Sequence, residues 1–173
     1  MKKSIPEVAS LKQDFLHRVG AKPTLRAAAW LYLYTSPISA FLAATLVVSA
    51  YYHAPELYET VGTGAGQHDP RWLASVVFNP LIESLMLLTL IKVSTKFGAG
   101  SLSTLIAATL MAILHSLQNL SWGLTVFVLF LIQSYAFYHV YESDFWRGYT
   151  VLSAAHALHN ASVLIALSLL RSF

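Results

Sequence analysis

A single carboxylate interrupts the apolar stretch at residues 79–90, NPLIESLMLLTL, where Glu83 stands among aliphatic side chains. The run around it, from about Trp72 to Val93, has the length and composition of a membrane-spanning helix. A charged side chain at the centre of such a helix costs about 2.5 to 3.5 kcal/mol on insertion scales. A carboxylate kept at that depth therefore indicates a functional site, and Glu83 is its first candidate residue.

The composition places the whole chain among integral membrane proteins. Of its 173 residues, 56% are hydrophobic and only 11% are charged, which is too apolar for an ordinary soluble domain of this length. The absence of cysteine excludes disulfides, a thiol nucleophile and a cysteine-based zinc site. The net charge of +3 is small, and the basic residues precede the first long apolar run, which favours membrane orientation over nucleic-acid binding.

The hydrophobic pattern predicts an all-α, polytopic membrane helix bundle of about five transmembrane helices, preceded by an N-terminal interfacial helix. Apolar positions recur at helical spacing over residues 5–20, where the interfacial helix is expected. The expected spans are about 27–52, 72–93, 102–120, 124–140 and 149–170, with loops at 53–71 and 142–147. The chain thus divides into an N-terminal segment, residues 1–26, and an integral membrane domain, residues 27–173.

The distribution of basic residues predicts the orientation of the bundle. Six Lys and Arg residues precede the first span, and Lys92 and Lys96 follow the second, whereas the loop between these spans has only Arg71. The positive-inside rule then places the N-terminus in the cytoplasm of a multi-pass protein of the cell membrane. Residues 1–26 lack the short apolar core of a cleaved signal peptide, so the spans themselves are expected to direct the chain to the bilayer.

Three of the predicted spans have polar groups at bilayer depth. Glu83 lies in the second, His115 in the third, and His156, His159 and Asn160 in the fifth. His156 and Asn160 are four residues apart and so share one helix face. A buried His or Asn often only joins neighbouring helices, but a carboxylate is too costly for that role alone. Together these residues predict a shared polar cavity that admits water.

Three short motifs then become informative: PLIE at 80–83, AILH at 112–115 and AHALHN at 155–160. In this order, on successive predicted spans, they resemble the CPBP family of intramembrane proteases, which includes CaaX endopeptidases and bacterial Abi-type proteins. That family's pattern is Glu-Glu-x-x-x-Arg, then Phe-x-x-x-His, then His-x-x-x-Asn. The resemblance covers about residues 72–165. The chain resembles a divergent, short member of that family, because three positions of the pattern differ. Ser84 replaces the second glutamate, Leu88 the arginine and Met111 the phenylalanine.

The resemblance implies a glutamic intramembrane endopeptidase that needs no cofactor and cuts a membrane-associated protein or peptide. In this assignment Glu83 and His115 activate a water molecule, while His156 and the amide of Asn160 stabilise the oxyanion. Because the second glutamate and the arginine of the pattern are absent, other side chains are expected to orient Glu83. The candidates for such supporting roles are His159, Ser84, Asn79 and Gln118, although His159 alternatively packs between helices and Gln118 alternatively caps one.

Two other interpretations use the same residues. Glu83, His115 and His156 form a possible two-His-one-carboxylate zinc set with an open fourth position, although the chain has no His-Glu-x-x-His run. A non-enzymatic protein is the other alternative, either an inactive relative that gives immunity to a peptide toxin or a small transporter whose Glu and His relay protons. Transport is disfavoured because the Glu-bearing span has no repeat and no second acid lies at depth.

Overall fold

The computed structural model of the chain describes residues 6–20, 24–53, 73–117 and 120–170, and these residues contain helices and no strand. The α-helices are α1 (Pro6–Val19), α2 (Thr24–His53), α4 (Asn79–Lys96), α5 (Leu102–Ser116), α6 (Leu120–Ala136) and α7 (Phe145–Leu170). Two π-helical turns complete the fold: η1 (Ala74–Phe78) leads directly into α4, and η2 (Phe137–Tyr141) extends α6. The prediction of an all-α helical bundle is confirmed.

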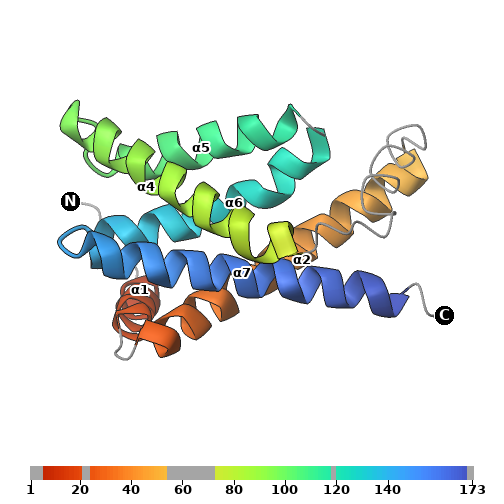
Figure 1. Ribbon diagram of the computed structural model, residues 1–173, viewed down its shortest axis with the longest axis horizontal. Helices are drawn as coiled ribbons and strands as arrows, with labels where there is room; N and C mark the ends of the chain where they lie inside the picture. Colours follow the sequence, from red (N-terminus) through yellow and green to blue (C-terminus); the bar gives the residue numbers. More distant parts are fainter. Residues whose placement is uncertain (1–5, 21–23, 54–72, 118–119, 171–173) are drawn as a thin grey trace.

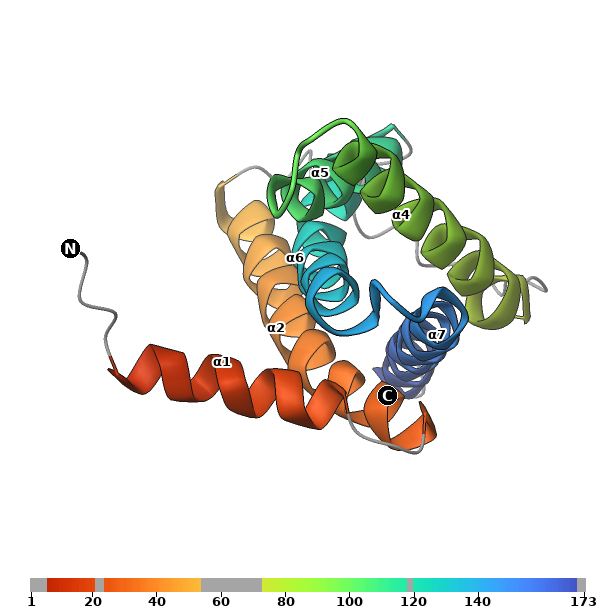
Figure 2. The same cartoon turned by 90° about the vertical axis from the view of Figure 1, so that its left-hand side faces the viewer.

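Five long helices surround a common interior, as the end-on view in Figure 2 shows. The order around the ring is α2, α6, α5, α4 and α7, and each helix packs against the next, with α7 closing the ring against α2. Helices that follow one another along the chain run in opposite directions along the long axis of the molecule, so that α7 and α2, which close the ring, run in the same direction (Figure 1). Each of the five therefore presents one face to the interior and the opposite face to the surroundings.

The helix α1 stands apart from the ring and crosses one end of the bundle (Figure 2). The ring of Phe15 packs edge-on against Tyr34 of α2 at 5.1 Å, and the Arg18 guanidinium lies 4.4 Å from the ring of Trp30. The hydroxyl of Tyr141 donates a hydrogen bond to the carbonyl of Val19, which fixes the end of α1 against η2. The predicted N-terminal helix is thus present, and it lies across the bundle instead of along it.

The interior is filled by aliphatic and aromatic side chains, while the outer faces are also apolar. The fully buried large side chains include Leu31, Leu87, Leu88, Ile91, Met111, Phe130, Phe137 and Leu152. The exposed apolar side chains come from every helix of the ring and include Phe41, Ile82, Leu105, Leu124 and Ile165. Outer faces with this much exposed apolar surface are suited to contact with lipid or with another apolar partner.

Two helices of the described chain are long and apolar enough to cross a membrane, Ala74–Lys96 and Trp122–Tyr141. The apolar helix α5 has 15 residues, which corresponds to about 22 Å and falls short of a hydrocarbon core of about 30 Å. The helical bundle is therefore shown, whereas the predicted total of five transmembrane helices is not.

The connections differ in part from those predicted. Gly98 and Gly100 adopt φ values of 84° and 52° in the turn between α4 and α5, a conformation that favours glycine. The loop predicted at 142–147 ends at Asp144, whose side chain accepts a hydrogen bond from the backbone N–H of Arg147 at 3.2 Å and so caps α7. Of the loop predicted at 53–71, His53 ends α2 and the remaining residues lie outside the described part of the chain.

Candidate active site

The Glu83 carboxylate lies between two imidazoles that come from different helices. Its Oε2 is 3.5 Å from Nε2 of His115 on α5 and 3.5 Å from Nε2 of His156 on α7. In the ring of helices α4 stands between α5 and α7, so a side chain on its inner face reaches both neighbours (Figure 2). The side chains are 20%, 17% and 4% exposed for Glu83, His115 and His156, which places the group just inside the bundle.

The environment of His115 defines which of its nitrogens holds a proton. Nδ1 lies 2.8 Å from the backbone carbonyl of Met111, and a carbonyl oxygen only accepts hydrogen bonds. Nδ1 of the neutral ring is therefore the protonated nitrogen, and Nε2 presents a lone pair toward Glu83. Two acceptors then face one another at a distance longer than a normal hydrogen bond. This arrangement suits a donor of two hydrogens, such as water.

Phe130 of α6 contacts both imidazoles and was not identified from the sequence. Its ring centroid lies 5.3 Å from that of His115 and 5.6 Å from that of His156, the second contact being edge to face. The side chain is fully buried, so it restricts both rings from the interior side. No motif marks Phe130 in the sequence, and only the packing of α6 against the other helices reveals this contact.

Asn160 lies one helical turn beyond His156 and is tied to the start of the Glu83 helix. Its Nδ2 donates a hydrogen bond to the backbone carbonyl of Ser75 at 2.8 Å. The π-helical turn explains why this carbonyl needs a donor. The N–H of Asn79 bonds to the carbonyl of Ala74, five residues back, and the next pair in that pattern would need an N–H from Pro80, which has none. One amide hydrogen of Asn160 is thus used, and one is left.

The side chains predicted to support Glu83 do not gather around it in the same way. Nδ1 of His159 lies 3.0 Å from Oγ of Ser36 on α2, and both side chains are buried, so this part of His159 joins α7 to α2. Ser84 is fully buried, and its hydroxyl has no hydrogen-bond partner among the described residues. Asn79 is exposed at the first position of α4, and Gln118 lies outside the described residues.

The zinc interpretation concerns Glu83, His115 and His156, the same three side chains that the structure brings together. In the part of the chain that the structure describes, no group of three or more His, Cys, Asp or Glu residues is arranged to hold a metal ion. Glu83, His115 and His156 converge on one carboxylate oxygen without forming such a set.

Comparisons of the chain with protein-family models, with curated proteins and with solved structures found no match. The functional assignment accordingly rests on the residues of the site and on their geometry.

Proposed function

We propose that the protein is an intramembrane endopeptidase of the glutamic type, which hydrolyses a peptide bond of a membrane-associated protein or peptide. The observation that supports this most directly is the convergence of two histidine Nε2 atoms on Oε2 of Glu83, each at 3.5 Å, within a bundle whose outer faces are apolar. The resemblance of the three motifs to the CPBP family adds the same four residues in the same order.

In the proposed reaction Glu83 and His115 hold the attacking water. The water donates one hydrogen to the Glu83 carboxylate and the other to the lone pair on Nε2 of His115. As its oxygen forms a bond to the scissile carbonyl carbon, Glu83 accepts the proton and then transfers it to the leaving amine when the C–N bond breaks. The products are a carboxylic acid and an amine, so the reaction needs no further reactant.

The negative charge that develops on the carbonyl oxygen requires hydrogen-bond donors. Nε2–H of His156 and the second amide hydrogen of Asn160 are the proposed donors, since one hydrogen of Asn160 is used on Ser75. A single well-placed donor of this kind contributes about 10² to 10³ in turnover. Asn160 thereby has two roles, because it also fixes the start of α4 on which Glu83 lies.

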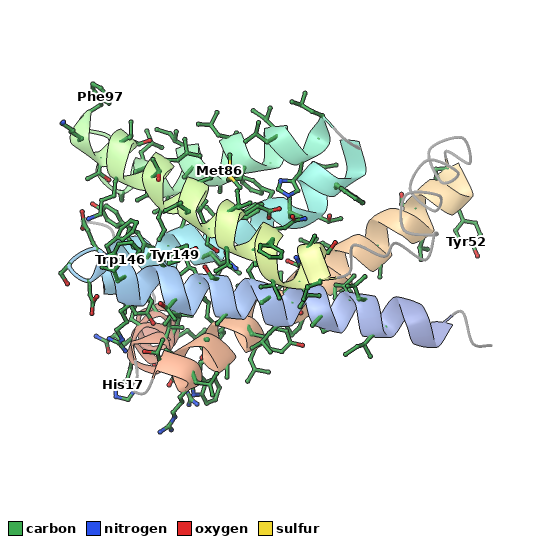
Figure 3. All side chains as sticks on the ribbon, viewed as in Figure 1. His17, Tyr52, Met86, Phe97, Trp146 and Tyr149 are labelled. Atoms are coloured by element: carbon green, nitrogen blue, oxygen red, sulfur yellow. The ribbon has the colours of Figure 1, made fainter. Side chains whose placement is uncertain are left out.

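We further propose that the helices of the ring form a multi-pass membrane bundle with the N-terminus in the cytoplasm. The described Lys and Arg residues lie near the end of the bundle where α2 and α7 begin and α4 ends (Figure 1): Lys12, Arg18, Arg26, Lys92, Lys96 and Arg147. The exposed aromatic residues Phe97 and Trp146 lie toward the same end, and Tyr52 lies at the opposite one (Figure 3). Cations with interfacial aromatics are typical of a cytoplasmic boundary.

The test compares membranes from cells that produce the wild type, Glu83→Gln or Asn160→Ala. Mapping the termini of membrane proteins by mass spectrometry should reveal a protein that accumulates uncut with both variants. The control is Glu142→Gln, which alters an exposed carboxylate outside the site and should leave cleavage unchanged. Identical termini in the wild type and in both folded site variants would overturn the protease assignment and favour a non-proteolytic role.

Removal of metal distinguishes the glutamic from the zinc mechanism. Once a cleaved protein is known, we expect the purified enzyme to retain its turnover after dialysis against a strong chelator, because Glu83 and His115 activate water without a metal. The measurement is turnover together with zinc content. Loss of turnover that zinc alone restores would instead establish a metalloprotease.

A further inference from the structure

A group of buried polar side chains next to the Glu83 site has no hydrogen-bond partner among the described residues. The unpartnered atoms are Oγ of Ser84, both Nε2 and Oε1 of Gln133, Oγ of Ser134, Oγ of Ser153 and Nδ1 of His156. They come from α4, α6 and α7, and all five side chains are buried. We call Ser84, Gln133, Ser134 and Ser153 the polar layer.

The contact between Phe130 and His156 places this layer relative to the site. It sets the two residues at the same level on α6 and α7, which run in opposite directions (Figure 1). Gln133 follows Phe130 by three residues and Ser153 precedes His156 by three, so each is displaced by about 4.5 Å toward the same end of the bundle. That end is the one with Lys92 and Arg147. Ser84, beside Glu83, contributes to the layer from α4.

Threonine hydroxyls elsewhere in the bundle behave differently, whether buried or exposed. The buried Thr35 donates a hydrogen bond of 2.9 Å to the carbonyl of Leu31, four residues back. Thr45, Thr89 and Thr150 are exposed, and each donates a hydrogen bond of 2.8 Å to the carbonyl four residues back in its own helix. A helix can therefore satisfy a hydroxyl without external help. The serines of the polar layer do not use this option.

Gln133 needs more hydrogen-bond partners than the serines of the polar layer, because its amide has two hydrogens to donate and an oxygen that accepts. Leaving a buried polar group unpaired is costly, and such groups in folded proteins are nearly always paired with protein or with ordered water. The layer contains no carboxylate of its own, so its donors and acceptors suit a neutral ligand that both donates and accepts. Water has this property.

We propose that the polar layer binds a cluster of buried water molecules that extends to Nδ1 of His156 and to Glu83. This inference rests on the proposed function, for which water is the second substrate. A water that donates to Nδ1 of His156 makes that nitrogen an acceptor, so that Nε2 holds the hydrogen directed at the oxyanion. Gln133 is then a positioning residue that acts through the water.

The experiment uses the full chain in lipid nanodiscs, with ¹⁵N-labelled histidine and glutamine side chains. Solid-state NMR transfer from water protons should reach Nδ1 of His156 and the amide of Gln133. Gln133→Met keeps the volume of the side chain while removing its donors and acceptors. It should abolish the water contact of His156, shift the tautomer of that ring, and lower kcat at least tenfold with KM unchanged and the melting temperature kept or raised.

The matched control is Ser103→Ala near the start of α5, twelve residues before His115. It removes another buried hydroxyl that has no hydrogen-bond partner within the described part of the chain. It should leave the histidine signals and kcat at their wild-type values. If the folded wild type shows no water contact at His156 and Gln133, or if Gln133→Met keeps both the tautomer and kcat, the inference is overturned. Cleavage that persists in Glu83→Gln would overturn the proposed function instead, and the NMR contacts do not depend on that result.

Discussion

Glu83 lies between two histidines, and uncharged side chains stand where the CPBP pattern has charged neighbours. Ser84 and Leu88 occupy those two positions, and both are fully buried on the inner side of α4. A glutamate and an arginine there would lie in the interior, where unpaired charge is costly. In this chain the interior around Glu83 is uncharged, and the imidazoles of His115 and His156 lie beside its carboxylate, each with Nε2 at 3.5 Å from Oε2.

Substitution of Ser36 separates packing from catalysis at the neighbouring His159. Ser36→Ala removes the hydrogen-bond partner of Nδ1 of His159, which should lower the free energy of unfolding by about 1 to 3 kcal/mol. Turnover in the proposed reaction should stay at the wild-type value for the folded variant, because the bond joins α2 to α7 and leaves the Glu83 contacts intact. Thermal unfolding in detergent and a cleavage assay measure the two effects.

The control for this prediction is Ser162→Ala, which removes a bond to the backbone carbonyl of His159 and leaves the imidazole contact with Ser36 in place. It should destabilise less. A loss of turnover in Ser36→Ala as large as that of His156→Ala would show that His159 supports the catalytic group directly.

At the scale of helices, α5 and α6 approach closely at Gly123. A Cβ atom there would lie 1.8 Å from Oγ of Ser116 and 2.4 Å from the carbonyl of Ala112. Small residues allow helix backbones to approach closely in this way. Ser116 follows His115 directly, so the packing at Gly123 helps to determine where that imidazole lies.

We therefore expect Gly123→Ala to destabilise the protein by about 1 to 3 kcal/mol, as overpacking does, and to lower turnover by displacing His115. Adding Ser116→Ala removes the hydroxyl but leaves the contact with the Ala112 carbonyl, so the double variant should recover only part of the loss. Thermal unfolding and kcat report the two effects. A single variant with wild-type stability would contradict the close approach of these helices.

The hydrogen bonds that Asp14 accepts from Arg18 of α1 and from Tyr34 of α2 should depend on pH. Arg18 Nε donates hydrogen bonds of 2.7 Å to both carboxylate oxygens of Asp14, and Tyr34 donates another of 3.1 Å. The hydrogen bond from Arg18 lowers the pKa of Asp14 below its ordinary value of 3.8. The stabilisation is therefore present above the pKa of the unfolded chain and is lost as the pH falls through the lower pKa of the folded state.

Asp14→Asn should weaken the attachment at neutral pH and remove its dependence on acid. Spin labels on Gln13→Cys and Leu33→Cys, both exposed positions, would report a broader distance distribution for this variant. Glu142→Asn, at another exposed carboxylate of the same end, should leave the distribution narrow. An unchanged distribution in Asp14→Asn would show that the aromatic contacts of Phe15 and Trp30 suffice.

At the scale of the whole molecule, the two ends of the bundle differ in chemistry. Phe97 and Trp146, 84% and 72% exposed, lie toward the end that has Lys92, Lys96 and Arg147, and Tyr52 at 73% lies at the other end (Figure 3). Lys92 and Arg147 also donate hydrogen bonds there, to the backbone carbonyls of Glu142 and Gly20. Hydrogen bonds from these two cations thus connect separate segments of the chain at the cationic end.

The absence of native cysteine allows the proposed orientation to be measured without removing any residue first. Phe97→Cys should react with a membrane-impermeant thiol reagent only from the cytoplasmic side, and Tyr52→Cys only from the opposite side. Intact and permeabilised cells give the two readings. Labelling of both positions from the same side would contradict the multi-pass orientation, and labelling of Phe97→Cys from outside would reverse it.

The helices and the helical positions of the polar residues follow from the sequence alone. Apolar composition, helical periodicity and the glycines at 98 and 100 act locally, so they predicted the bundle, the N-terminal helix and the placement of Glu83, His115 and His156 on separate helices. The end of the loop at Asp144 was not predicted, because the cap of α7 depends on one side-chain conformation.

Which side chains meet was decided by the tertiary structure. The contacts of Phe130 with both imidazoles, of Ser36 with His159 and of Asn160 with the carbonyl of Ser75 all join residues on different helices. They depend on how each helix is rotated about its axis and how closely it approaches its neighbours. Packing between helices sets those two quantities, and no local pattern in the sequence encodes them.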